Sequence, residues 1–76
     1  MDRLAAMTCF ARVAESESFT KAAVTLGVSR TTATQLVQQL EARLRVRLLQ
    51  RTTRSVKLTV EGEAYYARVV RLLADL

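Results

Sequence analysis

The sequence contains no histidine and only one cysteine, Cys9, and these absences exclude several kinds of site. A single cysteine cannot form an internal disulfide, which fits the reducing cytoplasm. A metal site built from histidine and cysteine has no ligands, and Glu61 and Glu63 lie at an expected helix start, so no metal or other cofactor is expected. General acid–base catalysis also has few candidate groups, so we predict that the chain is not an enzyme.

Long apolar runs are also missing from the sequence. No stretch approaches the roughly 18 apolar residues that suggest a membrane span, and the amino terminus lacks a basic segment followed by an apolar run. We therefore expect neither a membrane span nor a signal peptide. With 76 residues the chain is one small domain, in which a large hydrophobic pocket is not expected.

Acidic residues are absent from one strongly basic stretch. The formal net charge is +5, and six of the twelve basic residues lie between Ala42 and Val60, where there is no aspartate or glutamate. We call this stretch the basic segment; its basic residues are Arg43, Arg45, Arg47, Arg51, Arg54 and Lys57. Such a concentration of charge favours an anionic partner, either nucleic acid or a membrane surface. A solvated basic loop is the less favoured alternative, because solvated surfaces usually mix charges of both signs.

Helical periodicity and capping residues predict helices before the basic segment. The first covers residues 2–15, with Asp2 as its N-cap. Its Cys9 is expected to lie in the hydrophobic core of the domain. Its apolar side is formed by Leu4, Met7, Phe10, Ala11 and Ala14. A second helix is predicted over residues 19–26, with Ser18 as its N-cap.

Gly27 is expected to end the second helix in a left-handed conformation. A third helix is predicted over residues 29–44, with Ser29 as its N-cap. One side of this helix is apolar and consists of Ala33, Leu36, Val37, Leu40 and Leu44. The opposite side is polar but neutral and consists of Thr31, Thr34, Gln35 and Gln38. Glutamine can pair with adenine through two hydrogen bonds, and threonine offers a hydroxyl and a methyl group to thymine. We call this side the polar face and predict that it contacts DNA bases.

Two helices joined by a tight turn at residues 27–29 have the spacing of a helix-turn-helix, whose second helix enters the DNA major groove. An ordinary helical hairpin has the same spacing. The polar face and the basic segment favour DNA binding over this alternative.

The periodicity changes inside the basic segment, where residues 46–51 and 56–58 are two short runs typical of β-strands. A hairpin is predicted, with a loop longer than two residues because no Asn-Gly type of turn is present. Arg51 and Arg54 lie at the tip of this hairpin. Beside a helix-turn-helix such a hairpin is a wing, which can place arginine in the minor groove or against phosphates.

The last predicted helix begins at Val60, with Thr59 as its N-cap. Gly62 is expected to weaken its first turn slightly. Its apolar side is wider than the stripe of about 100° that one core requires, and consists of Tyr65, Tyr66, Val69, Val70, Leu72, Leu73 and Leu76. We expect a second copy of the chain to cover this side, in a homodimer formed through residues 60–76.

Several segments, in this order and spacing, are very specific when taken together: Met1–Met7, Ser18–Ala23, Leu26–Ser29, Leu40-Glu41, Val46–Arg54 and Leu58–Gly62. Through them the whole chain resembles the amino-terminal DNA-binding domain of LysR-type transcriptional regulators. These are bacterial proteins with a winged helix-turn-helix, a long linker helix that dimerises and a separate effector-sensing domain.

The resemblance implies particular contacts with DNA. It assigns major-groove base contacts to Arg30, Thr31, Thr32, Thr34 and Gln35, and wing contacts to Arg51 and Arg54. Gln38, on the polar face, completes the candidate residues. Gln35 replaces an arginine that is common in the family, which suggests adenine in place of guanine as its partner. Glu17 and Arg45 replace common glycines; if the backbone there is left-handed, each costs roughly 1 kcal/mol relative to glycine.

The predicted fold is mainly α with a small β-hairpin, a winged helix-turn-helix over residues 1–58 followed by a linker and dimerisation helix over residues 59–76. The predicted function is sequence-specific binding of a double-stranded DNA operator by a homodimer, or by a tetramer in a longer protein. A small-molecule effector is expected only through a domain outside this chain, and no membrane partner is expected. The competing hypothesis is a helical protein-interaction domain that binds an acidic protein, and it predicts no footprint on DNA.

Overall fold

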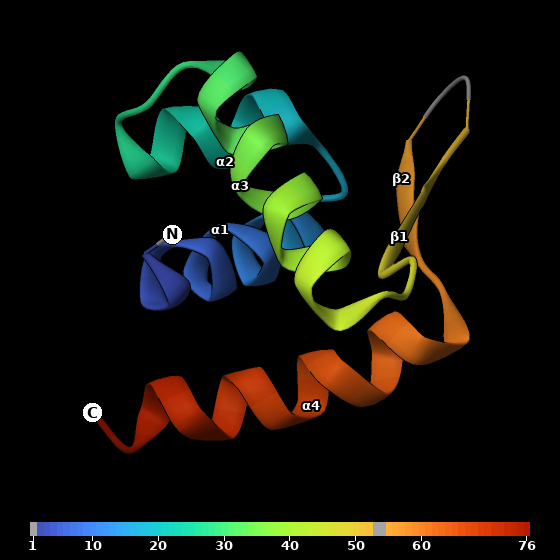
Figure 1. Ribbon diagram of the computed structural model, residues 1–76. Coiled ribbons are helices and arrows are strands. Elements are labelled where there is room, and N and C mark those ends of the chain that lie inside the picture. The colour runs from blue at the N-terminus through green and yellow to red at the C-terminus, as the bar shows by residue number, and fades with distance from the viewer. Residues whose placement is uncertain (1, 53–54) are drawn as a thin grey trace.

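The computed structural model describes residues 2–52 and 55–76, and in that part of the chain it contains four helices and one antiparallel hairpin (Figure 1). The elements are α1 (Arg3–Ser16), α2 (Phe19–Leu26), α3 (Arg30–Leu44), β1 (Leu49–Arg51), β2 (Val56–Leu58) and α4 (Val60–Ala74). Figure 1 shows α1, α2 and α3 grouped together, the hairpin beside them and α4 running beneath. The predicted fold class is confirmed.

Each helix begins at a side chain that accepts a hydrogen bond from a backbone N–H of the first turn, where the helix itself offers no partner. The four bonds are Ala5 N to Asp2 Oδ1 (3.1 Å), Lys21 N to Ser18 Oγ (3.1 Å), Thr32 N to Ser29 Oγ (3.0 Å) and Gly62 N to Thr59 Oγ1 (2.9 Å). All four predicted caps are confirmed.

The hydrophobic core is built around α1, which contacts α2, α3 and α4. Cys9 is fully buried there, and its Sγ donates to the carbonyl oxygen of Ala33 at 3.4 Å, so its expected core position is confirmed. The prediction that Leu4 and Leu44 lie in the core is wrong, because Leu4 is 48% exposed and Leu44 is 38% exposed. Leu4 lies in the first turn of α1 at the edge of the core, and Leu44 is the last residue of α3, where the chain leaves the helix.

The hairpin is shorter than predicted because β1 begins at Leu49 and not at Val46. The backbone N–H groups of Val46 and Leu48 donate to Glu41 of α3, to its carbonyl oxygen and to its carboxylate respectively, so they are unavailable to a strand partner. In the paired part, Leu49 faces Leu58 and Arg51 faces Val56. The connection covers residues 52–55, which confirms a loop longer than two residues.

Among the described residues, three have the left-handed backbone conformation that favours glycine: Glu17 (φ 56°), Gly27 (φ 72°) and Arg45 (φ 59°). They end α1, α2 and α3 respectively. The left-handed backbone considered for Glu17 and Arg45 is therefore present, and the cost of roughly 1 kcal/mol each relative to glycine stays a prediction.

Gly62 was expected only to weaken the first turn of α4 slightly. In the structure it also allows close packing of α4 on the backbone of Leu48. A Cβ atom added to Gly62 would lie 1.9 Å from the carbonyl oxygen of Leu48 and 2.9 Å from its carbonyl carbon. The same oxygen accepts a hydrogen bond from Thr59 N at 3.0 Å. The start of α4 therefore packs directly on the backbone before β1, and only a residue without a side chain fits.

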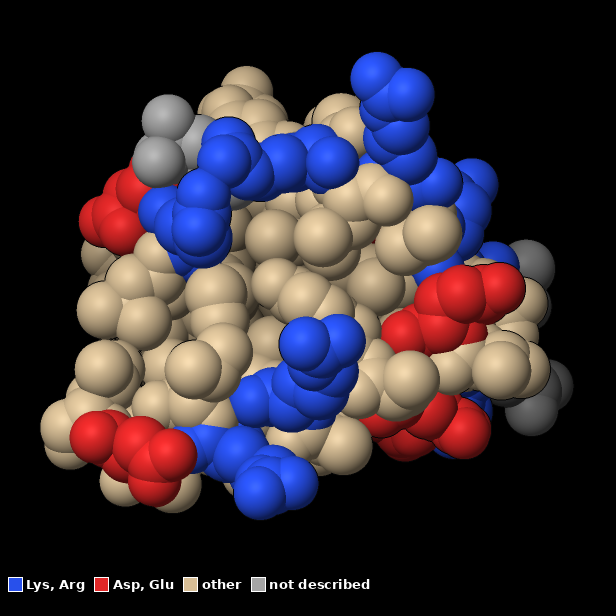
Figure 2. All heavy atoms as spheres, turned by 60° about the horizontal axis from the view of Figure 1, so that its bottom comes forward, with Lys and Arg blue, Asp and Glu red and all other residues tan. Residues whose placement is uncertain are grey.

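One side of α4 packs against α1. The Phe10 ring lies 5.6 Å from that of Tyr65 and 6.4 Å from that of Tyr66, measured between ring centres, and Val69 is fully buried. The rest of the apolar side is open: Leu72 is 55% exposed and Leu76 is 82% exposed. Figure 2, which brings this face forward, shows large uncharged areas with lysine and arginine in separate groups among them. Within the described residues, no helix combines the length and apolar character that crossing a membrane requires.

Candidate nucleic-acid interface

The polar face of α3 lies at the surface beside the hairpin. Thr31, Gln35 and Gln38 are exposed and Thr34 is half-buried. These four residues line one shallow hollow together with Arg30 and Arg51. The structure therefore brings six of the eight predicted site residues to one surface, and β1 contributes one of them.

Thr32 is exposed but does not line this hollow. Its hydroxyl oxygen accepts a hydrogen bond from Ser29 Oγ at 2.9 Å, and its backbone N–H donates to the same Ser29 oxygen. Thr32 thus takes part in the cap of α3, at the edge of the polar face.

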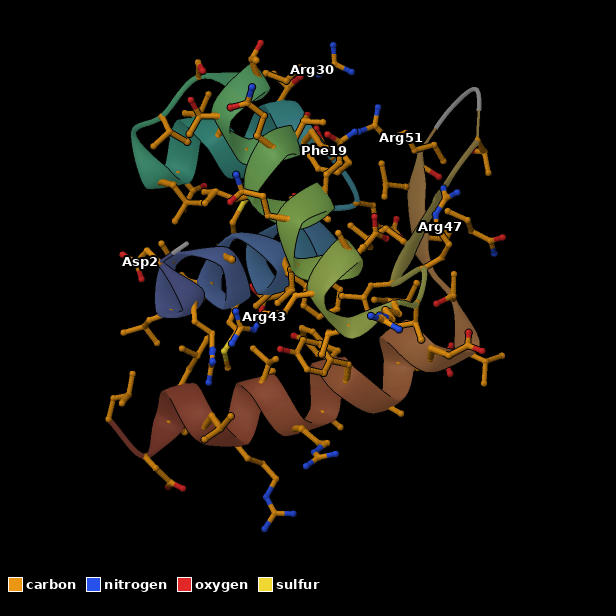
Figure 3. All side chains as sticks on the ribbon, in the orientation of Figure 1. Asp2, Phe19, Arg30, Arg43, Arg47 and Arg51 are labelled. Carbon is orange, nitrogen blue, oxygen red and sulfur yellow. The ribbon has the colours of Figure 1, made fainter. Side chains whose placement is uncertain are left out.

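Arg51 is held in place by an aromatic ring of the helical body. Its guanidinium carbon lies 4.5 Å from the centre of the Phe19 ring, and Phe19 is buried at the start of α2. Figure 3 shows the Arg51 side chain reaching from the hairpin toward α2 and α3, with Arg30 above it at the start of α3. A guanidinium over an aromatic face is a favourable cation–π arrangement, which leaves the rim of the guanidinium able to donate hydrogen bonds.

Two basic residues of the basic segment are paired with acids that lie outside it. Lys57 Nζ lies 2.6 Å from Glu17 Oε2, and Arg47 Nε lies 4.0 Å from Glu41 Oε2. Glu41 Oε2 also accepts from the backbone N–H groups of Leu48 (2.8 Å) and Leu49 (3.2 Å), so this carboxylate fastens the base of the hairpin to α3. Neither pairing was predicted from the sequence. Glu17 and Lys57 are 40 residues apart, and Arg47 approaches Glu41 only through the turn that follows the end of α3.

Arg54, the other predicted wing residue, lies outside the described residues. The described part of the loop is closed by hydrogen bonds between Thr52 and Ser55. Thr52 N donates to the Ser55 carbonyl oxygen at 2.8 Å, and Ser55 N donates to Thr52 Oγ1 at 2.9 Å.

The groups with shifted pKa values lie away from this interface, chiefly where α1 meets α4. Tyr66 Oη donates to Glu15 Oε2 at 2.7 Å, and this bond raises the pKa of Tyr66. Partial burial alone would raise the pKa of Glu15, but hydrogen bonds from Tyr66 and Arg12 lower it. Burial raises the pKa of the Cys9 thiol. In residues 2–52 and 55–76, no group of three histidine, cysteine or acidic side chains is placed to hold a metal ion.

Comparison with known proteins identifies relatives along the whole chain. Residues 4–63 match the family described as bacterial regulatory helix-turn-helix protein, lysR family. An HTH-type transcriptional repressor of Pseudomonas aeruginosa and the HTH-type transcriptional activator AaeR of Escherichia coli are each 45% identical over all 76 residues. The chain spans about a quarter of the length of these relatives, 24% and 25% respectively. They are transcriptional regulators, which are not enzymes.

Solved structures agree with this relationship. The BenM DNA-binding domain in complex with catB site 1 DNA is 38% identical, with a TM-score of 0.91 over 95% of this chain and 80% of that one. The CbnR DNA-binding domain in complex with DNA is 37% identical, with a TM-score of 0.89 over 93% of this chain and 82% of that one. The winged helix-turn-helix described above is thus the fold of both DNA complexes, and the chain belongs to the lysR family of bacterial regulatory helix-turn-helix proteins as a DNA-binding domain.

Proposed function

We propose that this domain binds double-stranded operator DNA in a sequence-specific manner by placing α3 in the major groove. The observation that supports this best is the hollow shared by Arg30, Thr31, Thr34, Gln35, Gln38 and Arg51. Four neutral hydrogen-bonding side chains and two arginines line this hollow together. The combination suits DNA recognition, in which polar side chains contact base edges and basic side chains contact phosphates.

The residues of α3 and of the wing have different proposed roles. Gln35 and Gln38, with Thr31 and Thr34, contact base edges, while Arg30 and Thr32 contact DNA at the amino-terminal end of α3. In the wing, Arg51 and Arg54 contact the minor groove or phosphates. Electrostatic contacts of this kind raise affinity for any sequence, whereas the polar face discriminates between sequences.

We also propose an arrangement for the protein to which the domain belongs. Residues 1–58 form the winged helix-turn-helix, and residues 59–76 form a linker helix whose exposed apolar side pairs two copies. A two-fold dimer places two α3 helices on successive major grooves, so α4 sets the spacing of the half-sites. In a longer protein the dimers can assemble into a tetramer, a separate domain senses a small molecule, and the regulator acts in the cytoplasm without a membrane partner.

Selection of bound duplexes from a random DNA library tests the proposal. The expected result is enrichment of a palindromic or near-palindromic motif, since a two-fold dimer contacts two equivalent half-sites. Binding that depends on salt but enriches no motif would contradict base recognition by the polar face. Absence of binding to any duplex at low salt would contradict DNA binding altogether and would favour an acidic protein as the partner.

A further inference from the structure

Glu17 occupies an unusual place for an acidic residue, at the left-handed corner between α1 and α2 (φ 56°, ψ 31°). Glycine is the residue that this conformation favours, because a Cβ atom is crowded there. The chain nevertheless has a carboxylate at this corner. Its contacts show what the side chain does.

Both the backbone and the side chain of Glu17 contact β2. The Glu17 carbonyl oxygen accepts a hydrogen bond from Val56 N at 3.3 Å, and Glu17 Oε2 accepts one from Lys57 Nζ at 2.6 Å. The two side chains are about half exposed, at 47% for Glu17 and 53% for Lys57. The ion pair is therefore open to water and to competing anions.

Glu17 also lies next to the DNA-facing surface. It lines a hollow with Arg30, Arg51, Thr52 and Ser55. Arg30 and Arg51 also line the hollow of the polar face, so the two hollows adjoin. A phosphate that approaches these arginines therefore also approaches the Glu17 carboxylate, which lies on the same surface. The positive charge of Lys57 is already paired with this carboxylate.

We propose that Glu17 weakens the binding of DNA of any sequence, because it holds Lys57 in an intramolecular ion pair that a phosphate must replace. This inference rests on the proposed function. A half-exposed pair is weak and is screened by salt, so exchange of the Lys57 partner from carboxylate to phosphate is possible. While Glu17 keeps its charge, the exchange adds little to affinity, since one ion pair is lost for the one that is gained.

The variant Glu17→Gln isolates the charge, because glutamine keeps the size of the side chain and the same backbone strain. The probe is a short fluorescent duplex of random sequence, titrated with protein at several salt concentrations. Release of Lys57 adds one phosphate contact, so the plot of log affinity against log salt should steepen by about 0.9. At about 0.1 M salt the variant should bind roughly five- to tenfold more tightly.

Glu63→Gln is the matched control. It changes the net charge by the same amount, at an exposed position in the first turn of α4, and its carboxylate has no ion pair within the described residues. Its affinity for the same duplex should change by less than about twofold, with an unchanged salt slope. An equal gain in both variants would show that only net charge matters, and would overturn the proposal.

Two further variants separate the alternatives. The double variant Glu17→Gln with Lys57→Met has the net charge of the wild type and should return to wild-type affinity and slope. Lys57→Met alone should change the slope by no more than about 0.3, because this lysine is already paired. A loss of about 0.9 in slope from Lys57→Met alone would mean that Lys57 contacts phosphate fully in the wild type, and would overturn the proposal.

A decrease in affinity in Glu17→Gln would also overturn the proposal, since it would mean that the pair supports DNA binding by holding the wing. Circular dichroism and thermal unfolding are the controls that test whether each variant is folded. Failure of the wild type to bind any duplex at low salt would instead contradict the proposed function. A wild type that binds, with variants that do not differ from it, would contradict this inference alone.

Discussion

The guanidinium of Arg51 lies over the ring of Phe19, 4.5 Å from its centre, and this contact joins the hairpin to the start of α2. Phe19 is only 5% exposed, so its position is set by the core. The core thereby orients Arg51 of the wing in the absence of DNA. Arg51 should therefore lose less conformational entropy on DNA binding than an unrestrained arginine would.

The first prediction concerns this orientation. Phe19→Leu keeps an apolar side chain in the core but removes the aromatic face. It should lower DNA affinity by about 0.5 to 1 kcal/mol, the usual magnitude of an exposed cation–π contact. In an Arg51→Ala background the same change should have almost no further effect on affinity, which a double-mutant cycle measures.

The matched control for that prediction is Phe10→Leu. Phe10 is a fully buried phenylalanine whose ring contacts those of Tyr65 and Tyr66, whereas Arg51 lies over the ring of Phe19. It should lower the free energy of unfolding without changing DNA affinity in the folded protein. An equal loss of affinity from Phe19→Leu with and without Arg51 would show that the ring acts through the fold alone.

Local features of this fold were predictable from the sequence. The caps at Asp2, Ser18, Ser29 and Thr59 depend on a side chain and a backbone N–H three residues later, so short spacing is enough to find them. The polar face of α3 was predictable for the same reason, because helical periodicity places its residues together.

Features that depend on distant parts of the chain were not predictable in this way. The basic segment contains no acid, yet Glu17, at the end of α1, pairs with Lys57, 40 residues further along the chain. Glu41 of α3 pairs with Arg47 across the turn that follows this helix. The start of β1 was misplaced because Glu41 accepts hydrogen bonds from the backbone N–H groups of Val46 and Leu48, which a longer strand would use. Only the tertiary structure brings these groups together.

The second prediction concerns Gly62. Gly62→Ala should lower the free energy of unfolding by about 1 to 3 kcal/mol, although alanine is the better helix former, because the new methyl group meets the rigid carbonyl of Leu48. Gly27→Ala is the control: it has open space around it but a left-handed φ, and should cost only about 1 kcal/mol. Urea denaturation measures both, and a Gly62→Ala variant as stable as the wild type would disprove the close packing.

The third prediction separates base recognition from phosphate contact. Gln35→Ala should weaken binding to a selected operator by about 1 to 3 kcal/mol and leave binding to unrelated duplex DNA almost unchanged. Its side chain is uncharged, so the salt slope should also remain the same. Fluorescence anisotropy on both duplexes measures these quantities. Equal losses on operator and unrelated DNA would remove Gln35 from the base-contacting residues.

The last prediction concerns the open side of α4. Leu72 is 55% exposed on that side, and a second copy of the chain would bury it. Analytical ultracentrifugation should show a concentration-dependent dimer for the wild type and a monomer for Leu72→Glu, because a buried, unpaired carboxylate is costly. Val24→Glu is the matched control: Val24 is 78% exposed on α2, away from α4, and its variant should still dimerise. A wild-type chain that stays monomeric at high concentration would contradict dimerisation through residues 60–76. A dimer that is lost in Leu72→Glu but kept in Val24→Glu would place the interface on this side of α4.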